Sequence, residues 1–216
     1  MSLLALVFVA QLVSSLCFLA GTGLCARALG VATERLQLGF GPAIMKRKIG
    51  SVTYAFGMFP LGSYVQFERP DAPEDAPEDA EPPPDAFERA SRVRRLTIAL
   101  TGLLSMALIP LVWFGPIDGA IHIWRGIPQL VGGAISPFGT ARGLIEAADA
   151  LPALTLMPIF MAKIAAYQIL PLPATNLWTI LRVLLGGGWQ RSVIGPLVTV
   201  LFGGVWLVAV VSWLFA

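Results

Sequence analysis

The chain contains 216 residues, of which 56% are hydrophobic and only 13% are charged, and its mean hydropathy is +0.75. A chain this apolar cannot hide its surface inside one soluble core, so the composition predicts an integral membrane protein. The net charge of +2 is too small to indicate a nucleic-acid partner, and none is expected.

Apolar runs that could cross a bilayer recur along the chain, each close to the roughly 20 residues that the hydrocarbon core requires. The first run has no basic segment before it and exceeds the roughly 7–15 apolar residues of a secretory signal, so we expect it to remain as a helix. Four spans are predicted, at about residues 3–29, 96–114, 154–170 (continuing past a break to 185) and 194–215.

Basic residues gather in the first loop, while the second loop carries only Arg125 and Arg142. Because lysine and arginine are retained on the cytoplasmic side of membranes, we expect the first loop to be cytoplasmic and both termini to lie outside. The basic residues of the first loop are Arg27, Arg35, Lys46, Arg47, Lys48, Arg69, Arg89, Arg92, Arg94 and Arg95.

The first loop divides into an ordered part and a solvated part. A Gly-Phe-Gly-Pro turn occupies residues 39–42, and β-prone runs at 52–56 and 63–67 predict a small β-hairpin at the membrane surface. Residues 71–85 repeat acid, alanine and proline, a composition typical of an extended tether. We therefore expect three parts: residues 1–66 with the first span and hairpin, an acidic linker at 67–93, and a membrane core at 94–216.

The second loop, residues 115–150, is moderately apolar and rich in Gly and Pro, and we expect it to be interfacial or re-entrant. It holds the chain's only histidine, His122, four residues after Asp118. Three strong ligands cannot be assembled around this histidine, so no metal site is expected there. Cys17 and Cys25 lie about two turns apart on one predicted helix and are interpreted as packing residues.

The third span is interrupted at residues 170–173, Leu-Pro-Leu-Pro, because proline blocks helix continuation and removes a backbone donor. We expect Gln168, Thr175 and Asn176 to hydrogen-bond the freed backbone groups. Lys163 lies in the same span, where an ionisable group suggests a functional role. The alternative is that its long side chain reaches the interface or a backbone carbonyl.

Several stretches, in the right order, resemble the site-2 protease family of zinc intramembrane metalloproteases. The family's Pro-Leu-Gly-Gly-Tyr-Val signature matches residues 60–65 with one glycine changed, and its Asn-x-x-Pro-x-Pro stretch leading to Leu-Asp-Gly aligns with residues 168–177. In a weaker match, only Gly102 survives from an Ala-Gly-Pro-x-x-Asn motif. The residues expected after the family's His-Glu-x-x-His helix are Ala26, Arg27, Gly30, Val31 and the turn at 39–42.

The resemblance implies an all-α polytopic membrane protein of about four transmembrane helices with a small cytosolic hairpin, most simply in a bacterial-type inner membrane. It places the family's two zinc histidines on Phe18 and Thr22, the general-base glutamate on Leu19, and the aspartate ligand on Asn176. These side chains cannot replace imidazole, carboxylate and base. We therefore expect no zinc cofactor and no enzyme activity, with Phe18 and Leu19 packing and Thr22 bonding its own backbone.

The resulting prediction is a catalytically inactive relative, a pseudoprotease, that binds membrane proteins or an active protease, or serves as a regulatory or structural subunit. A hairpin edge can bind an extended peptide by adding a strand, which needs no metal. The alternative is an active zinc-dependent intramembrane endopeptidase that cleaves transmembrane substrates. The predicted partner-binding residues are Tyr54, Phe56, Pro60, Gly62, Tyr64 and Val65.

Overall fold

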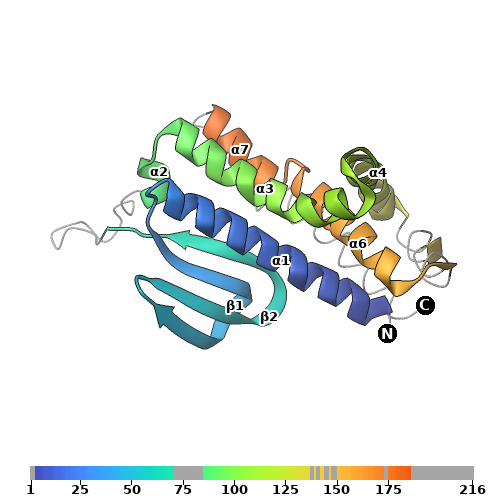
Figure 1. Ribbon diagram of the computed structural model, residues 1–216, viewed down its shortest axis with the longest axis horizontal. Helices are drawn as coiled ribbons and strands as arrows, with labels where there is room; N and C mark the ends of the chain where they lie inside the picture. The colour runs from blue at the N-terminus through green and yellow to red at the C-terminus, as the bar shows by residue number, and fades with distance from the viewer. Residues whose placement is uncertain are drawn as a thin grey trace.

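The computed structural model describes residues 3–70, 85–136, 139, 142–143, 146, 150–172 and 175–185. In this part of the chain, helices form one body and a small sheet packs along one side of it (Figure 1). The predicted tether, apart from Asp85, and the predicted fourth span lie outside the described residues. The elements are α1 (Leu3–Ala28), β1 (Thr33–Ile49), β2 (Val52–Phe67), α2 (Ala86–Arg89), α3 (Arg92–Phe114), α4 (Pro116–Ile135), α6 (Ala153–Gln168) and α7 (Asn176–Leu185).

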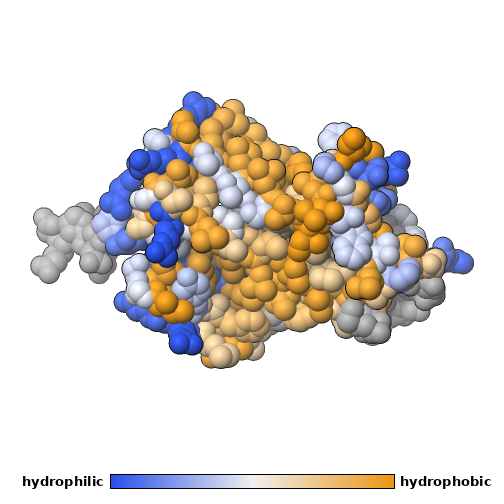
Figure 2. Space-filling view, viewed as in Figure 1, coloured by the Kyte–Doolittle hydropathy of each residue, from blue (hydrophilic) through white to orange (hydrophobic). Residues whose placement is uncertain are grey.

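Two of the described helices are long and apolar enough to cross a membrane: α1 over Ala5–Ala28, and α3. They correspond to the first two predicted spans. The third predicted span is divided into the shorter helices α6 and α7 on either side of the Leu-Pro-Leu-Pro break. The predicted count of four spans is therefore not confirmed, although the surface fits a membrane protein, since hydrophobic residues cover its central band and hydrophilic residues gather toward both ends (Figure 2).

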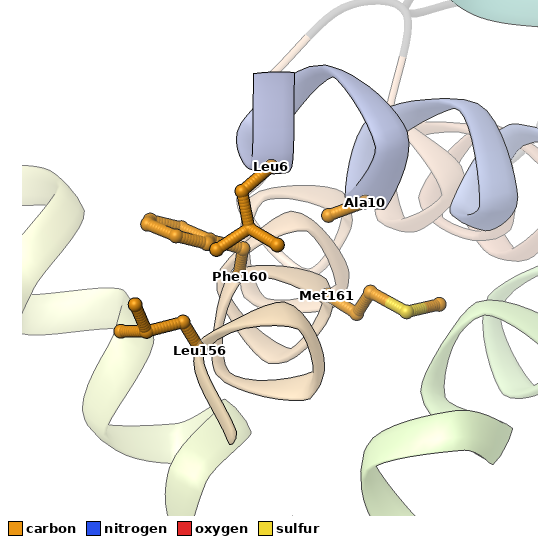
Figure 3. Close-up of a cluster of buried hydrophobic side chains, with 5 residues drawn as sticks. All are labelled: Leu6, Ala10, Leu156, Phe160 and Met161. Carbon is orange, nitrogen blue, oxygen red and sulfur yellow. The ribbon is translucent and has the colours of Figure 1, made fainter. Parts of the chain in front are cut away.

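The helical body is centred on α6, which contacts α1, α3 and α4. At one end of α6, Leu6 and Ala10 of α1 meet Leu156, Phe160 and Met161 (Figure 3). Further along, the alanines at positions 162, 165 and 166 are fully buried against Ala107 of α3 and Ile123 of α4. Small side chains let helix backbones approach closely, which is how helices associate when lipid supplies no hydrophobic driving force.

The end of α1 is joined to the start of α3 through a compact corner. Asp85 caps α2 by accepting a hydrogen bond from the backbone N–H of Glu88, whose side chain bonds back to Asp85. The ring of Phe87 then stacks on Phe67 at the end of β2, with centroids 5.0 Å apart. This corner fixes where the sheet ends relative to the helices.

The predicted hairpin is wrong in its pairing, because the runs at 52–56 and 63–67 both belong to β2 and pair with β1, not with each other. The sheet is also larger than predicted, since β1 begins at Thr33 and both strands bend. The two strands pair antiparallel, yet the first half of β1 has partners on both sides: Leu36 pairs with Val65 and also with Tyr54. In the pairing of 35–38 with 53–56, residue numbers increase in the same direction along both segments, so these two segments run parallel. The segments therefore lie side by side in the order 63–67, 33–38, 53–56 and 45–49.

The sheet also extends further along α1 than a hairpin beyond the end of the first span would. The Ser63 hydroxyl donates a hydrogen bond to the carbonyl of Ser15, 3.4 Å away and near the middle of the α1 span. Gly23 of α1 faces Leu36, so closely that a Cβ on Gly23 would lie 3.1 Å from a Leu36 methyl group. The sheet thus runs alongside the second half of α1 (Figure 1) instead of resting beyond its end.

Candidate functional site

The positions aligned with the family's His-Glu-x-x-His motif lie on α1, and two of them face α3. A Cβ on Gly102 of α3 would lie 2.6 Å from the Thr22 hydroxyl and 2.9 Å from the Phe18 ring. One turn further along α3, Ser105 contacts Gly21 of α1, where a Cβ on Gly21 would collide with the Ser105 side chain. Helices α1 and α3 are therefore in close contact, and the Phe18 ring and Thr22 hydroxyl fill the space beside Gly102.

The packing expected of these positions is confirmed in part. Leu19 is buried and Phe18 is half-buried. Thr22 is 5% exposed, and its hydroxyl has no hydrogen-bond partner among the described residues, so it does not bond its own backbone as predicted. An unpaired buried hydroxyl is costly.

Asn176, the fourth aligned position, is buried at the start of α7 and also faces α3. Its side-chain amide donates to Gln168 Oε1 at 3.4 Å and points at the sulfur of Met106, 3.9 Å away. Met106 lies one turn after Gly102. The fold thus brings Phe18, Thr22 and Asn176 to neighbouring turns of α3, although the sequence separates them by about 150 residues.

The side chains at these four positions do not fit a zinc ion. Zinc in proteins is held by imidazole, thiolate or carboxylate groups, and catalytic sites use three of them. The four positions carry a phenyl ring, an isobutyl group, a hydroxyl and a carboxamide. Of these, the carboxamide oxygen is the strongest metal ligand, and it is neutral. Among the described residues no cluster of three His, Cys, Asp or Glu side chains occurs. No hydrolytic step is therefore assigned to these four residues.

The break between α6 and α7 is closed by polar side chains, as predicted for Gln168 and Thr175, whereas the Asn176 amide bonds the Gln168 side chain and not the backbone. The Thr175 hydroxyl lies 2.7 Å from the carbonyl oxygens of both Leu170 and Leu172. Gln168 Oε1 accepts the backbone N–H of Asn176 at 3.1 Å. These contacts add side-chain hydrogen bonds to backbone groups at the break, where the helical bonding pattern stops.

Two of the predicted partner-binding residues hold the bend of the sheet. Tyr64 donates its hydroxyl to Gln37 Oε1 at 2.9 Å and stacks on Phe40, with centroids 6.5 Å apart. Gly62 has φ +76° and packs under the Phe40 ring, where a Cβ would lie 2.5 Å away. Glycine is thus required by both backbone and space.

The other predicted partner-binding residues differ in position. Tyr54 is exposed, whereas Phe56 is half-buried between two paired segments and Val65 is half-buried in the outer segment 63–67. The side chain of Pro60 lies outside the described residues. Whether any of these residues binds a partner stays a prediction.

Sequence reasoning did not identify Gln37, which is 1% exposed. Its amide donates to the carbonyl of Gly41 at 2.9 Å and lies 3.3 Å from that of Gly39. Its position in the sequence, between Leu36 and Leu38, could have identified it, because a polar side chain buried in an apolar strand needs hydrogen-bond partners inside the protein. Gln37 therefore links the turn at 39–42 to Tyr64.

One outer edge of the sheet is formed by the end of β1, and the other by residues 63–67. Residues 45–49 pair with 52–56 on one side, and within the described part of the chain nothing pairs with the other side. This edge strand carries exposed apolar side chains, Met45 and Ile49, on either side of Lys46, Arg47 and Lys48. Unpaired N–H and C=O groups along such an edge can accept another strand.

The described fold is a body of apolar helices with a bent sheet beside its first helix and a Leu-Pro-Leu-Pro break between α6 and α7. The sequence that forms it matches a known family. The model of peptidase family M50 matches residues 20–213, which is most of the chain. The chain therefore belongs to peptidase family M50, the site-2 protease family, and the resemblance noted in the sequence is confirmed.

Similar proteins carry names from the same family. A protein of Chlamydia trachomatis named "Putative zinc metalloprotease" is 34% identical over 97 residues, covering 43% of this chain and 16% of that protein. A similarly named protein of Nostoc is 36% identical over 132 residues, covering 57% of this chain and 35% of its own length. The chain thus spans between about a sixth and a third of these relatives.

These names overturn the prediction that the chain is not an enzyme. Both the family and its relatives are described as peptidases or zinc metalloproteases, and nothing in the described structure demonstrates inactivity. The prediction rested on residue types at four aligned positions. A zinc site is defined by side chains that converge in space from any part of a protein, so four positions do not decide whether it hydrolyses peptide bonds.

Proposed function

We propose that this chain acts in the zinc-dependent proteolysis of membrane proteins and that its sheet holds an extended segment of the substrate. Family membership supports the first part. The second part is supported by one observation above all: the 45–49 edge is unpaired within the described residues, on a sheet that lies beside a helix fit to span a membrane.

Strand addition explains how such an edge would recognise a substrate. Main-chain hydrogen bonds supply affinity for any extended segment, and alternate side chains supply selectivity. A substrate helix must unwind locally before an extended strand can form, so the edge would select segments next to a helix break. The three basic residues at 46–48 would favour segments with acidic side chains or anionic neighbours.

The experiment is site-specific photocrosslinking of the full-length protein in native membranes. A photoreactive residue replacing Met45 or Ile49 should capture a membrane protein through residues bordering one of its spans. A residue replacing Val93, which is similarly exposed but lies on α3, is the matched control. Equal capture from Val93 and from the edge positions would overturn the strand-addition proposal.

Peptide-bond hydrolysis by this chain itself is the second candidate, and it is the one that the names of the family and relatives favour. It requires a resident zinc ion. About one zinc per chain in the purified full-length protein, together with chelator-sensitive cleavage of a transmembrane reporter, would establish it. Full-length protein that binds no zinc when zinc is supplied and leaves the reporter uncut would rule it out.

A further inference from the structure

Helix α4 presents three distinct faces, of which only one is buried. Gly119 packs on the backbone at Pro110 and Leu111 of α3, and Gly126 packs on α6, where a Cβ would lie 2.6 Å from the Ala166 methyl group. Ile123, between them, is 7% exposed. These close approaches fix α4 on the helical body and determine which of its other residues point outward.

The second face of α4 is an exposed apolar stripe. Its side chains recur at intervals of three, four or seven residues, so they follow one side of the helix. Nothing in the described part of the chain covers them. A contiguous exposed apolar stripe on a helix commonly marks a membrane-binding or partner-binding surface. The stripe consists of Ile117 (76% exposed), Ile121 (40%), Trp124 (72%), Val131 (43%) and Ile135 (80%).

The third face is polar and carries Asp118, His122, Arg125 and Gln129, also at helical spacing. His122 is engaged with the ring of Phe114, with centroids 4.4 Å apart. Asp118 lies two turns before Arg125 and forms no ion pair with it.

Lys163 of α6 completes this polar face. Its aliphatic chain crosses Gly126, where a Cβ would lie 3.3 Å from Lys163 Cδ, and its ammonium group donates to Gln129 Oε1. Arg125 directly precedes Gly126, where a Cβ would lie 3.6 Å from Lys163 Cα, so the two cations extend from the same contact between α4 and α6. Neither cation has an acidic partner among the described residues, whose two ion pairs are Arg142–Glu146 and Arg182–Glu88.

We propose that Arg125 and Lys163 bind the phosphate of an anionic phospholipid headgroup, while the apolar stripe of α4 enters the acyl region beside it. Two adjacent cations with no acidic partner in the described structure provide charge complementarity for a phosphate. The adjoining stripe supplies the apolar contact that a lipid offers and a free ion does not. Such a combination is typical of helices that lie in the membrane interface.

The position of α4 agrees with an interfacial site. It follows α3 directly and packs on α3 and α6 at the end of the helical body where α1 begins (Figure 1). The Lys163 stem lies along apolar surface while its charge reaches the polar face, the arrangement expected of a lysine at a membrane boundary. A phosphate group there would hold α4 at a fixed depth.

Native mass spectrometry of the full-length protein in detergent, titrated with phosphatidylglycerol or phosphatidylcholine, tests this site. The unmodified protein should retain phosphatidylglycerol in preference to phosphatidylcholine. Loss of one cation should weaken phosphatidylglycerol retention about fivefold in Arg125→Gln, and loss of both about 25-fold in Arg125→Gln with Lys163→Gln. The charge-retaining Arg125→Lys variant should bind nearly as the unmodified protein does.

Arg142→Gln is the matched control, because it removes an exposed arginine that is paired with Glu146. It should leave phosphatidylglycerol retention unchanged. Equal retention by Arg125→Gln and the unmodified protein would overturn the proposal. Because Arg125 is exposed, its replacement should leave the fold intact, and thermal unfolding of the variant checks this. Displacement of the lipid by millimolar inorganic phosphate would also overturn it, since the site would then serve a free ion.

Discussion

Ser63 of β2 donates its hydroxyl to the backbone carbonyl of Ser15 in α1, 3.4 Å away, and so ties the bend of the sheet to the middle of a helix long enough to span a membrane. The bend exposes Phe40, Met58 and Phe59, whereas the opposite end of the sheet carries Lys46 to Lys48. One end of the sheet is thus suited to lipid and the other to water.

Spin labels should detect this polarity. A label replacing Phe59 should collide with oxygen more than with a water-soluble nickel chelate, because oxygen concentrates in the hydrocarbon region. A label replacing Ser51, in the exposed connection between the strands, should show the reverse preference. Electron paramagnetic resonance of the protein in liposomes measures both. Similar nickel accessibility at the two positions would contradict the placement of the bend at membrane depth.

Gly102 should be intolerant of side chains. Gly102→Ala introduces a Cβ 2.6 Å from the Thr22 hydroxyl and 2.9 Å from the Phe18 ring, and overpacking of this kind costs about 1–3 kcal/mol. Thermal unfolding in detergent should show a lower Tm.

Gly132→Ala is the control for Gly102→Ala, because nothing lies within 4 Å of a Cβ at that helical position. Its Tm should not fall. Adding Thr22→Ala to Gly102→Ala should recover part of the lost stability, since the hydroxyl is the nearest contact. Absence of any recovery would indicate that the α1–α3 contact is not limited by Thr22.

Tyr64→Phe should loosen the bend of the sheet. The variant deletes the donor to Gln37 and leaves a buried amide oxygen without this partner, at a cost of about 1–3 kcal/mol. Hydrogen exchange of the amides at residues 36–41 should accelerate. Tyr54→Phe removes the same hydroxyl from an exposed tyrosine of the same strand and should leave exchange unchanged. Equal effects of the two changes would contradict a specific role for the Tyr64–Gln37 bond.

Thr175→Val should destabilise the α6–α7 break. Valine has nearly the same shape but can neither donate to the Leu170 or Leu172 carbonyl nor accept from the Trp178 backbone N–H. Both carbonyls keep a backbone N–H donor, so we expect a loss of about 0.5–1.5 kcal/mol, the net value of a hydrogen bond. The readout is Tm, or the rate of proteolysis near residue 172. Thr97→Val, at an exposed position whose hydroxyl bonds only its own helix, should change neither. A neutral Thr175→Val would mean that the break does not depend on this hydroxyl.

The extent of the sheet shows where sequence reasoning stops. The β-prone runs at 52–56 and 63–67 were identified, and both lie in β2. The strand at 33–38 was missed because the Gly-Phe-Gly-Pro segment after it suggested only a turn. Its strand conformation depends on partners on both sides, Val65 and Tyr54 for Leu36, which no local pattern encodes.

The candidate site was likewise only partly predictable. Motif spacing identified Phe18, Thr22 and Asn176 as equivalent positions, but their convergence on α3 at Gly102 and Met106 follows from helix packing. Lys163 was recognised as an unusual residue for a span, whereas its bond to Gln129, 34 residues away, depends on α4 crossing α6.

The sequence by itself determined that the chain is a membrane protein, where α1 and α3 lie, where the third apolar run breaks, and which family it belongs to. These properties depend on apolar length, proline and motif order, which are local. The tertiary structure alone decided the position of the sheet along α1, which segments form its edges, and the pairing of Lys163 with the polar face of α4. Those features arise from contacts between residues far apart in the chain, where packing and charge in three dimensions select among many locally acceptable arrangements.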